Sequence, residues 1–412
     1  MAVMIQPEGA STSPIAARST ESAGDSTSTE VRSAAHRREA PWLILAGGGT
    51  GGHLFPGLAV ADLLRAARPE YEIAVFGTTR PIDREVVLPR GHALVPQTVR
   101  AFPRRPWQWP GFFLAWRSSL AAAREHFERR RPVAVLGLGG YAAAPPVIVA
   151  SEMGVPTALF NPDAVPGRAN RRLARCVRQV FVQWPVTAEA FAGSGAIVHV
   201  TGCPVRPRVL SARREEGCAT FRLDPGRPIL LVTGASQGAR SINLACLELV
   251  QFLKATSEWQ ILHVTGPADL ETVRSGYSAA GLDARIMAFT EAMPEALAAA
   301  DLVIARAGAS TLAELTARGI ASILLPYPYD RHQHQRANAR VLERAGAAVV
   351  IDDAGDPRAN ATSLRAHLER LMSSCADRAV MAAASRGLGR PDAGERIAAL
   401  LLAAADNAPR AD

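Results

Sequence analysis

The sequence predicts an α/β protein with two parallel-sheet domains. From residue 41 onward, short apolar runs alternate with amphipathic stretches, which is typical of a parallel sheet covered by helices on both faces. Glycine-rich loops follow the first expected strand of each half, at 47–52 and 233–239. The length of 412 residues also exceeds what one hydrophobic core usually fills. We therefore expect two Rossmann-like domains whose strand ends face a cleft between them.

The N-terminal domain is expected to span residues 41–205. Each short apolar run bounded by turn residues is interpreted as a buried strand. A helix is expected near 56–67, after the first glycine loop. The expected strands are 42–46, 73–76, 133–136, 156–160, 180–182 and 198–200.

The C-terminal domain is expected over residues 206–385. It begins with a polar stretch rich in Arg and Glu, which we interpret as a linker and a helix. Residues 386–405 are expected to form a helix that packs back on the N-terminal domain. The expected strands are 229–232, 259–264, 284–288, 302–305, 323–325 and 348–351.

Composition narrows the classes of function. The formal charge is +8, and residues 100–131 hold eight arginines against Glu125 and Glu128, which suits an anionic partner such as a nucleic acid or a lipid surface. Lys254 is the only lysine, which argues against a Walker A ATPase and against Schiff-base chemistry. Five scattered cysteines without a Cys-x-x-Cys motif indicate a reducing, cytosolic setting.

Residues 1–40 are expected to form a disordered tail. They are rich in Ser, Thr and Ala and contain no apolar stretch of the kind that a secretory signal needs. No uncharged apolar run in the chain approaches the roughly 20 residues that cross a bilayer. Any contact with a membrane is therefore expected to be peripheral.

The loop after the first strand points to chemistry beside an anion. Gly47, Gly49 and Gly52 allow close approach of the main chain to a phosphate. A dinucleotide enzyme would have an acidic residue at the end of the second strand, whereas Glu72 stands at its start. His53 follows the last glycine directly and is a candidate general base, since neutral imidazole suits that role near pH 7. The alternative is a histidine that only caps the helix.

A second group of polar residues follows two expected strands of the C-terminal domain. Residues 306–314 run from a strand into a helix, and Glu314 lies about one turn in. This carboxylate either favours the helix dipole or accepts hydrogen bonds from a ribose diol. The amides and imidazoles at 332–338 suit sugar hydroxyls. Metal binding by His332 and His334 is an alternative, but no carboxylate or cysteine set completes such a site.

Taken in order, these motifs resemble those of the MurG family, the glycosyltransferases that add N-acetylglucosamine to lipid I in peptidoglycan synthesis. The resemblance covers about residues 41–350 and implies a GT-B fold. The C-terminal domain would hold UDP-N-acetylglucosamine and the N-terminal domain the lipid acceptor. The matching motifs are Gly-Gly-Thr-Gly-Gly-His at 48–53, Gly-Gly-Tyr at 139–141, Thr-Gly-Cys-Pro-Val-Arg at 201–206, Ser-Gln-Gly-Ala at 236–239, Gly-Ala-Ser-Thr-Leu-Ala-Glu at 308–314, and His334-Gln335 with Asn338.

The resemblance also implies roles for individual residues. His53 would deprotonate the muramoyl 4-hydroxyl for an inverting attack on the anomeric carbon. Glu314 would hold the ribose and Ser236 a phosphate oxygen, while the main chain near Phe289 and Thr290 would read uracil. No cofactor and no metal ion is implied. The other implied substrate contacts are Thr50, Gly51, Gly52, Asp163, Gln237, Arg306, Gly308, Ala309 and Asn338, with Arg206 beside the diphosphate and His334 and Gln335 at the sugar hydroxyls.

Three positions depart from the pattern of the family. Asp163 stands where the family usually has Asn, Ala307 replaces a usual Ser, and Ala235 replaces a usual Gly. The last two changes are small. Asp163 exchanges an amide donor for a carboxylate in a segment that touches the donor sugar, so it bears on the preference for that sugar.

Arg and aromatic side chains are interleaved over residues 104–117. This pattern suits the headgroups of anionic lipids, and MurG-like proteins carry a membrane-facing patch at this point. The alternative is a core helix preceded by a Pro-rich loop. The resemblance therefore implies a peripheral protein on the cytoplasmic side of the cell membrane. The patch residues are Arg104, Arg105, Trp107, Trp109, Phe112, Phe113 and Trp116.

Other functions remain open at this point. The chain is also compatible with a GT-B transferase that glycosylates a diacylglycerol or small aglycone, and with a catalytically silent UDP-sugar scaffold, which Asp163 keeps open. A hydrolysing UDP-N-acetylglucosamine epimerase shares this fold, but it needs more carboxylates in its site than the motifs of this sequence supply. Nucleic-acid binding is disfavoured because no recognised module accompanies the Arg block. The expected partners are UDP-N-acetylglucosamine, lipid I and an anionic membrane surface.

Overall fold

The computed structural model describes most of the chain. The described residues are 40–49, 51–100, 103, 105–234, 238–330 and 332–407. Among the residues and segments singled out from the sequence, Thr50, Arg104, Ala235, Ser236 and Gln237 lie outside the described residues, as does nearly all of the expected tail.

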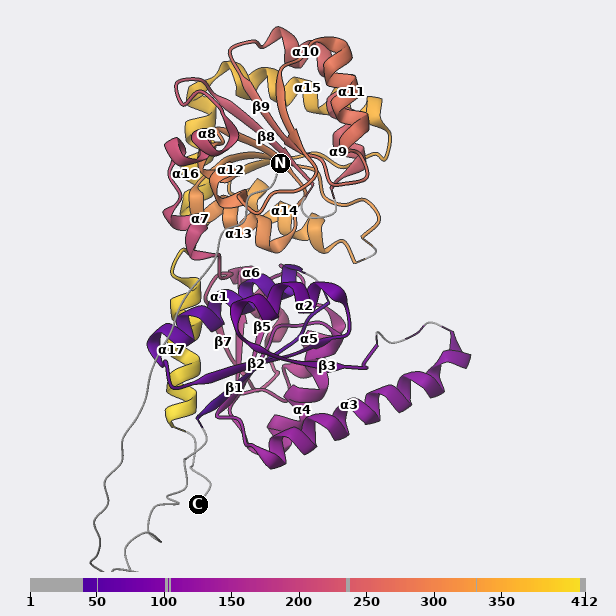
Figure 1. Cartoon of the computed structure of the whole chain (residues 1–412), viewed down its shortest axis with the longest axis vertical. Helices are drawn as coiled ribbons and strands as arrows, with labels where there is room; N and C mark the ends of the chain where they lie inside the picture. The colour runs from indigo at the N-terminus through magenta and orange to yellow at the C-terminus, as the bar shows by residue number, and fades with distance from the viewer. Residues whose placement is uncertain are drawn as a thin grey trace, which may run out of the picture. The chain divides into compact units, whose positions relative to one another are not determined.

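The N-terminal domain is built on a parallel sheet whose strand order is β3-β2-β1-β4-β5-β6-β7 (Figure 1). Central strand β1 pairs with β2 on one side and with β4 on the other. Both faces of these strands are buried, which explains why they read as continuous apolar runs. The strands are β1 (Trp42–Ala46), β2 (Glu72–Thr78), β3 (Ala93–Gln97), β4 (Ala134–Gly137), β5 (Thr157–Asn161), β6 (Gln179–Val182) and β7 (Ile197–Val200).

The C-terminal domain repeats this plan in the order β10-β9-β8-β11-β12-β13, again with parallel pairing. The expectation of two parallel-sheet α/β domains is therefore confirmed. The strands are β8 (Ile229–Thr233), β9 (Gln260–Val264), β10 (Ala284–Met287), β11 (Leu302–Ala305), β12 (Ala321–Leu324) and β13 (Ala348–Val350).

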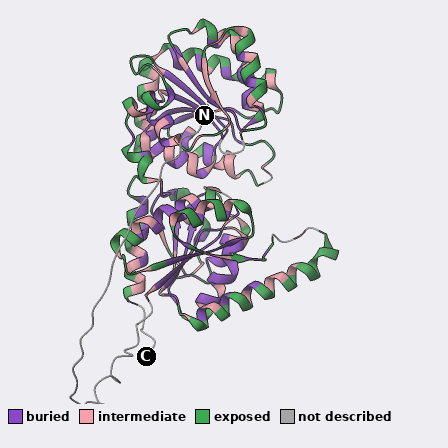
Figure 2. Cartoon of the chain, in the orientation of Figure 1, coloured by how far each residue is buried: buried purple, intermediate pink, exposed green. Residues whose placement is uncertain are grey.

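Helices pack on both faces of each sheet, as Figure 2 shows by the buried strands between partly exposed helices. Helices of the N-terminal domain are α1 (Gly51–Ala67), α2 (Pro81–Val87), α3 (Trp109–Arg129), α4 (Ala144–Glu152), α5 (Arg168–Leu173) and α6 (Pro185–Ala188). The remaining helices are α7 (Pro207–Ser211), α8 (Arg214–Phe221), α9 (Arg240–Glu248), α10 (Val250–Ala255), α11 (Leu270–Ala280), α12 (Met293–Ala299), α13 (Ala309–Arg318), α14 (His334–Arg344), α15 (Pro357–Ser373), α16 (Cys375–Leu388) and α17 (Ala393–Asp406).

Alternation along β1 divides the N-terminal core into two halves. Leu43 and Leu45 pack with Leu54 of α1, whereas Ile44 packs with Phe127 of α3 on the opposite face. Successive side chains of a strand point to opposite faces, so one five-residue strand contributes to both cores. The position of α1 against β1 follows directly from this arrangement.

Both sheets reverse their strand order beside the first strand of the domain. In the N-terminal sheet the reversal lies between β1 and β4, and in the C-terminal sheet between β8 and β11. Loops at the carboxyl ends of two such strands diverge and leave a crevice, which is where open α/β sheets bind their ligands. The glycine loops at 47–52 and 233–239 follow β1 and β8, so both stand at such a point.

Helix α17 joins the core of the N-terminal domain. Ile397 and Leu401 are buried in the same cluster as Leu54 of α1. An ion pair of 3.0 Å between Arg68 and Asp406 lies at the end of the same helix. The last helix of the chain therefore contributes apolar surface to the first domain.

Two local predictions were incomplete. Strand β3 was not among the expected strands. It contains Pro96, which a central strand would not tolerate, and it lies at the edge of the sheet, where proline is accepted. Helix α1 was expected near residue 56 but begins at Gly51. Glycine is a poor helix former, so the sequence suggested a later start, whereas the helix includes both glycines and His53.

Gly217 provides a test of the packing between α8 and α12. A Cβ at this position would lie 2.2 Å from the main-chain oxygen of Glu295, so the two helices would have to separate. Gly217→Ala is expected to lower the free energy of unfolding by roughly 1–3 kcal/mol, measured by urea denaturation. Gly387→Ala is the matched control, because a Cβ there meets nothing within 4 Å. Equal stability of the two variants would contradict this account of the helix contact.

Candidate active site

The glycine loop after β1 is held by the buried carboxylate of Asp83. This side chain is fully buried at the start of α2. Its Oδ1 accepts a hydrogen bond of 2.7 Å from the N–H of Gly49, and its Oδ2 accepts one of 2.6 Å from the N–H of Thr78. Main-chain donors from the ends of β1 and β2 are thus joined through one acidic side chain.

The space around the Asp83 carboxylate restricts which residues can stand in the glycine loop. A Cβ at Gly48 would lie 2.1 Å from Asp83 Oδ2, so only glycine fits. Gly49 adopts a φ of 83°, which favours glycine as well. Arg80 closes the loop from the other side by donating to the carbonyl oxygen of Gly49 at 2.9 Å. The sequence indicated the glycines but not Asp83, which lies 34 residues further along.

His53 occupies the third position of α1 and is partly buried. Its imidazole faces the loop after β4: a Cβ at Gly140 would lie 3.7 Å from His53 Cε1 and one at Gly139 would lie 3.6 Å from Cδ2. Burial lowers the pKa of His53 below its ordinary value, and the charge of Asp163 acts in the opposite direction. The imidazole is therefore neutral at pH 7 and able to accept a proton.

Asp163 lies in the loop that leaves β5. Asn161, the last residue of β5, donates from its side chain to the main-chain oxygen of Asp163 at 2.7 Å. Asn170 of α5 in turn donates to the side-chain oxygen of Asn161 at 2.9 Å. This chain of amides fixes the loop at the carboxyl edge of the N-terminal sheet.

Helix α14 of the C-terminal domain contacts this same loop. Asn338 donates from Nδ2 to Asp163 Oδ1 at 2.9 Å, and its Oδ1 accepts from the N–H of Ala164 at 2.7 Å. Nδ1 of His334 lies 2.9 Å from the carbonyl oxygen of Val165. Asn338 is fully buried, so its amide links the two domains and does not face open solvent.

A second contact between the domains joins Ser310 to the main chain of Gly52, and it depends on the absence of an N–H group at Pro56. Pro56 in α1 has no N–H, so the carbonyl oxygen of Gly52, four residues earlier, receives no helical hydrogen bond from it. The hydroxyl of Ser310 instead donates to this oxygen at 3.3 Å. Ser310 is the second residue of α13, and Gly308 and Ala309 precede it at the start of that helix. The N-terminal ends of α1 and α13 therefore lie side by side.

Glu314 of α13 forms an ion pair with Arg206 at 3.1 Å. Burial raises the pKa of the Glu314 carboxyl, and the Arg206 guanidinium opposes this shift. The same guanidinium lies over the ring of Phe55, 5.8 Å from its centroid. The two residues that the sequence assigned to ribose and diphosphate thus contact each other.

The side chain of Arg306 is buried and is hydrogen-bonded within the C-terminal domain. Its Nη1 donates to Asp353 Oδ2 at 2.6 Å and to the carbonyl oxygen of Leu325 at 3.0 Å, and its Nη2 donates to Ser241 Oγ at 2.8 Å. Both members of the Arg306–Asp353 pair are nearly buried. Hydrogen bonds from Ser241, Arg306 and Asn360 hold the pKa of Asp353 below its usual value, although burial alone would raise it. Arg306 therefore joins β11 to the start of α9 in this structure.

Of the remaining candidates in the C-terminal domain, Gln335 is the second residue of α14, and Phe289 and Thr290 lie in the loop after β10. Gln335 accepts from the N–H of Tyr327 at 3.0 Å, which fixes the turn before α14. Phe289 follows β10 and is 59% exposed, and Thr290 Oγ1 accepts from the N–H of Ala292 at 3.0 Å. No group of three or more His, Cys, Asp or Glu within the described part of the chain is arranged to hold a metal ion.

The site therefore has two parts. Hydrogen bonds and close contacts connect Gly52, Asp163, His334 and Asn338 across the two domains, while His53 lies over Gly139 and Gly140 on the N-terminal side. Thr290 and Gln335 accept hydrogen bonds from main-chain groups close in the sequence, and Phe289 is exposed. Asp83 and Asp353 were not predicted, because nothing in the sequence near either residue reveals its distant partners.

The interleaved Arg and aromatic residues lie before and at the start of α3. Trp107 is 72% exposed and Phe113 is 51% exposed, and Arg105 lies over the Trp107 ring at 5.4 Å. Burial in α3 is confined to its second half, where Phe127 joins the core. Among the described residues, no helix is both long and apolar enough to span a bilayer. The first half of α3 thus presents aromatic side chains to solvent.

Comparison with known proteins identifies the family. Residues 43–182 match the glycosyltransferase family 28 N-terminal domain, and residues 229–397 match the C-terminal domain of the same family. The chain belongs to glycosyltransferase family 28. The first match runs from β1 to the end of β6 and the second from β8 into α17, so each match contains most or all of one parallel sheet.

Members of family 28 resemble this chain along nearly its whole described length. A relative from Moorella thermoacetica is 39% identical over 367 residues, covering 87% of this chain and 98% of that protein. One from Sorangium cellulosum is 40% identical over 378 residues, covering 89% of each. Both are named UDP-N-acetylglucosamine–N-acetylmuramyl-(pentapeptide) pyrophosphoryl-undecaprenol N-acetylglucosamine transferase.

Solved structures place this family 28 chain in a broader fold group. MurG from Acinetobacter baumannii matches with a TM-score of 0.68 at 24% identity, covering 88% of this chain and 99% of that one. UDP-GlcNAc 2-epimerase from Neisseria meningitidis matches with a TM-score of 0.60 at 13% identity, covering 88% and 100%. At these identities the likeness concerns the fold, and it confirms the expected GT-B class.

Asp83 provides a test of how the glycine loop is held. In Asp83→Asn, one carboxylate oxygen becomes an NH₂ group that faces a main-chain donor, so a hydrogen bond is lost and the loop relaxes. We expect the free energy of unfolding to fall by about 1–3 kcal/mol and transferase turnover to fall with it, measured by urea denaturation and initial rates. Glu85→Gln, on the exposed side of α2, is the control. Unchanged turnover in Asp83→Asn would show that the loop does not depend on this carboxylate.

Proposed function

We propose that this protein transfers N-acetylglucosamine from UDP-N-acetylglucosamine to the muramoyl 4-hydroxyl of lipid I. The observation that carries the proposal is the similarity to relatives of that name over 85–89% of this chain and nearly all of theirs. The crevices at the carboxyl edges of both sheets provide a place for two substrates.

His53 is the general base in this proposal. The neutral imidazole takes the proton of the acceptor 4-hydroxyl, whose oxygen then bonds to the anomeric carbon from the face opposite to UDP. The bond from the anomeric carbon to the phosphate oxygen breaks, and UDP leaves with both electrons. Main-chain N–H groups at the start of α1 and the positive end of its dipole would stabilise the developing charge.

The donor is proposed to bind at the carboxyl edge of the C-terminal sheet. Glu314 would accept hydrogen bonds from the ribose diol, for which Arg206 must move from the carboxylate toward the diphosphate. The main chain near Phe289 and Thr290 would contact uracil, and Gln335 and His334 the sugar hydroxyls. The start of α13, with Gly308 and Ala309, adds N–H donors for phosphate oxygens. Thr50, Ser236 and Gln237 are assigned from their motifs alone.

Residues 105–116 are proposed to hold the protein at the cytoplasmic face of an anionic membrane. Exposed Trp107 and Phe113 would enter the headgroup region, and Arg105 would contact phosphates. This surface belongs to the N-terminal domain, which the proposal assigns to the lipid acceptor. Peripheral attachment would therefore bring the base near a membrane-bound substrate.

The direct test is to incubate the protein with UDP-N-acetylglucosamine and a lipid I analogue. We expect a disaccharide product and one UDP released for each product formed, detected by mass spectrometry and a coupled assay. Other UDP-sugars tested in parallel measure the effect of Asp163 on donor choice. Transfer to a diacylglycerol or a small aglycone, with none to lipid I, would overturn the proposal.

Replacing His53 tests the assignment of the base. His53→Ala is expected to lower kcat by about 10²–10⁴-fold while the KM for UDP-N-acetylglucosamine changes little, since the base acts on the acceptor. Steady-state kinetics with both substrates separate the two effects. His367→Ala, in α15, is the control for a histidine outside the site. A kcat that is the same in both variants would contradict the role of His53.

Replacing Asp163 tests the electrostatics of the base. A base must be neutral to act, so kcat/KM falls as pH drops through the pKa of His53 in the free enzyme. Asp163 raises that pKa, and Asp163→Asn therefore shifts the acidic limb of the profile to lower pH. The pH profile of kcat/KM for the acceptor measures this shift, with Asp352→Asn as control. A limb that stays in place or moves to higher pH would exclude this coupling.

The membrane surface is tested with vesicles containing anionic phospholipid. Replacing Trp107 and Phe113 together with Ser is expected to reduce vesicle binding at least about tenfold, because two large apolar side chains no longer enter the bilayer. Sedimentation measures the bound fraction, and activity on a soluble acceptor analogue should be retained. The control replaces Ile197 and Val380, which are comparably exposed elsewhere. Equal binding by both double variants would argue against this surface.

A further inference from the structure

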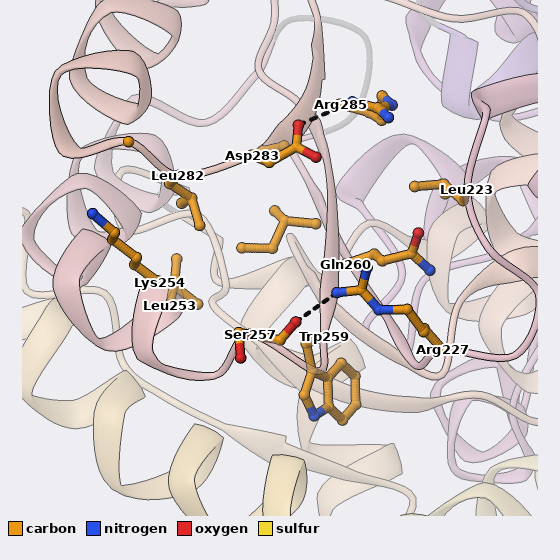
Figure 3. A pocket seen from close by; sticks show the side chains of 13 residues that line it. Leu223, Arg227, Leu253, Lys254, Ser257, Trp259, Gln260, Leu282, Asp283 and Arg285 are labelled. Atoms are coloured by element: carbon orange, nitrogen blue, oxygen red, sulfur yellow. Dashed lines mark hydrogen bonds and ion pairs between the residues drawn. The ribbon is translucent and has the colours of Figure 1, made fainter.

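A cavity of about 320 Å³ lies at the amino ends of β9 and β10 (Figure 3). Parallel strands put all their amino ends at one edge of the sheet, so this cavity and the glycine loop after β8 are at opposite edges of the C-terminal sheet. Strands of five residues separate the two edges by on the order of 16 Å. The cavity is therefore distinct from the substrate crevice.

The inner surface of the cavity combines polar groups with apolar side chains. Leu253 of α10 and Ile261 of β9 are both buried, and Leu282 forms part of one wall. The indole of Trp259 lies at the bottom of the view in Figure 3. A volume of this size falls within the range of small-molecule sites, and the lining offers an apolar body a place to bind.

Cationic side chains surround this apolar surface on different sides. Figure 3 shows Lys254 on one side of the cavity and Arg227 and Arg285 on the other. Asp283 is the one carboxylate of the lining, and it pairs with Arg285 at 3.1 Å. The lining therefore carries an excess of two positive charges.

Two of these cations have only main-chain partners. Lys254 donates to the carbonyl oxygen of Ala280 at 2.8 Å, and Arg227 donates to those of Ser257 and Glu258. Within the described residues, no ion pair of either side chain is found. Each therefore keeps a net charge, and the Lys254 ammonium has two further N–H donors. These are the groups that would form charge-assisted hydrogen bonds with an anion.

We propose that this cavity binds a small organic anion, in which a carboxylate, phosphate or sulfonate group is attached to an apolar body. The apolar body lies over Ile261 and Leu282, and the anionic group contacts Lys254, while Arg227 adds positive charge from the opposite side of the cavity. The combination carries the inference: cations alone occur on many surfaces, whereas here they flank a cavity whose wall includes Leu253, Ile261 and Leu282. The site is separate from the one that binds the nucleotide sugar.

A fluorescent probe of this chemistry tests the site. 8-Anilinonaphthalene-1-sulfonate joins a sulfonate to an aromatic body, and N-phenyl-1-naphthylamine is its neutral counterpart. For the whole protein carrying Arg227→Gln and Lys254→Met, we expect the Kd of the sulfonate probe to rise at least tenfold and that of the neutral probe to change less than twofold. The control protein carries Arg274→Gln and Arg365→Met, exposed cations of the same domain.

Three outcomes would overturn the proposal. An unchanged Kd of the sulfonate probe would remove the role of the two cations. Equal weakening of both probes would indicate an apolar contact without anion recognition. Displacement of the probe by saturating UDP-N-acetylglucosamine would locate it in the substrate crevice.

Lys254 also allows the location to be measured directly. Because it is the only lysine of the chain, acetic anhydride can acylate only one lysine amine, and peptide mass spectrometry follows its rate. Saturating 8-anilinonaphthalene-1-sulfonate is expected to slow acylation of Lys254 at least fivefold, while the α-amino group reacts as before. Equal rates with and without the probe would place the bound anion elsewhere and contradict the proposal.

Discussion

The N-terminal half of the site depends on one acceptor, the buried carboxylate of Asp83. It binds main-chain N–H groups from the ends of β1 and β2, and those two strand ends leave the sheet beside each other. A neutral side chain could not accept from both donors with the strength of a carboxylate. The path of the loop, the start of α1 and therefore the place of His53 all follow from this anchoring.

The C-terminal half uses charge in a comparable way. Arg306 and Asp353 form a nearly buried pair that joins β11 to the start of α9, the helix that follows the second glycine loop. Burying either charge alone would be costly, so the pair is needed as a unit. Glu314 differs, because its ion pair with Arg206 is only partly buried. The buried Arg306–Asp353 pair thus stabilises the fold, whereas the partly exposed Arg206–Glu314 pair lies where the donor is proposed to bind.

The fold could be predicted from sequence because strands buried on both faces give continuous apolar runs, and glycines mark the turns after β1 and β8. Edge strand β3, with Pro96, lacked that signal. Predicting the site was more difficult. Motifs indicated which loops carry polar residues, whereas the contact between Asn338 and Asp163 joins residues 175 positions apart. Asp83 is no different in local sequence from an exposed acidic residue at the start of a helix, and only the folded chain reveals its partners.

The hydrogen bond between Ser310 and Gly52 shows how a residue within a helix can determine a contact between the two domains. Its acceptor is the main-chain carbonyl of Gly52, which is available because the nitrogen of Pro56 carries no hydrogen. Substitutions at Gly52 that preserve the helix therefore leave the carbonyl oxygen of residue 52 in place as an acceptor. Loss of the proline would return the carbonyl to the helix and release the hydroxyl. Pro56 thus determines where Ser310 of the C-terminal domain can bind on α1, although the bond itself is made to the main chain of Gly52.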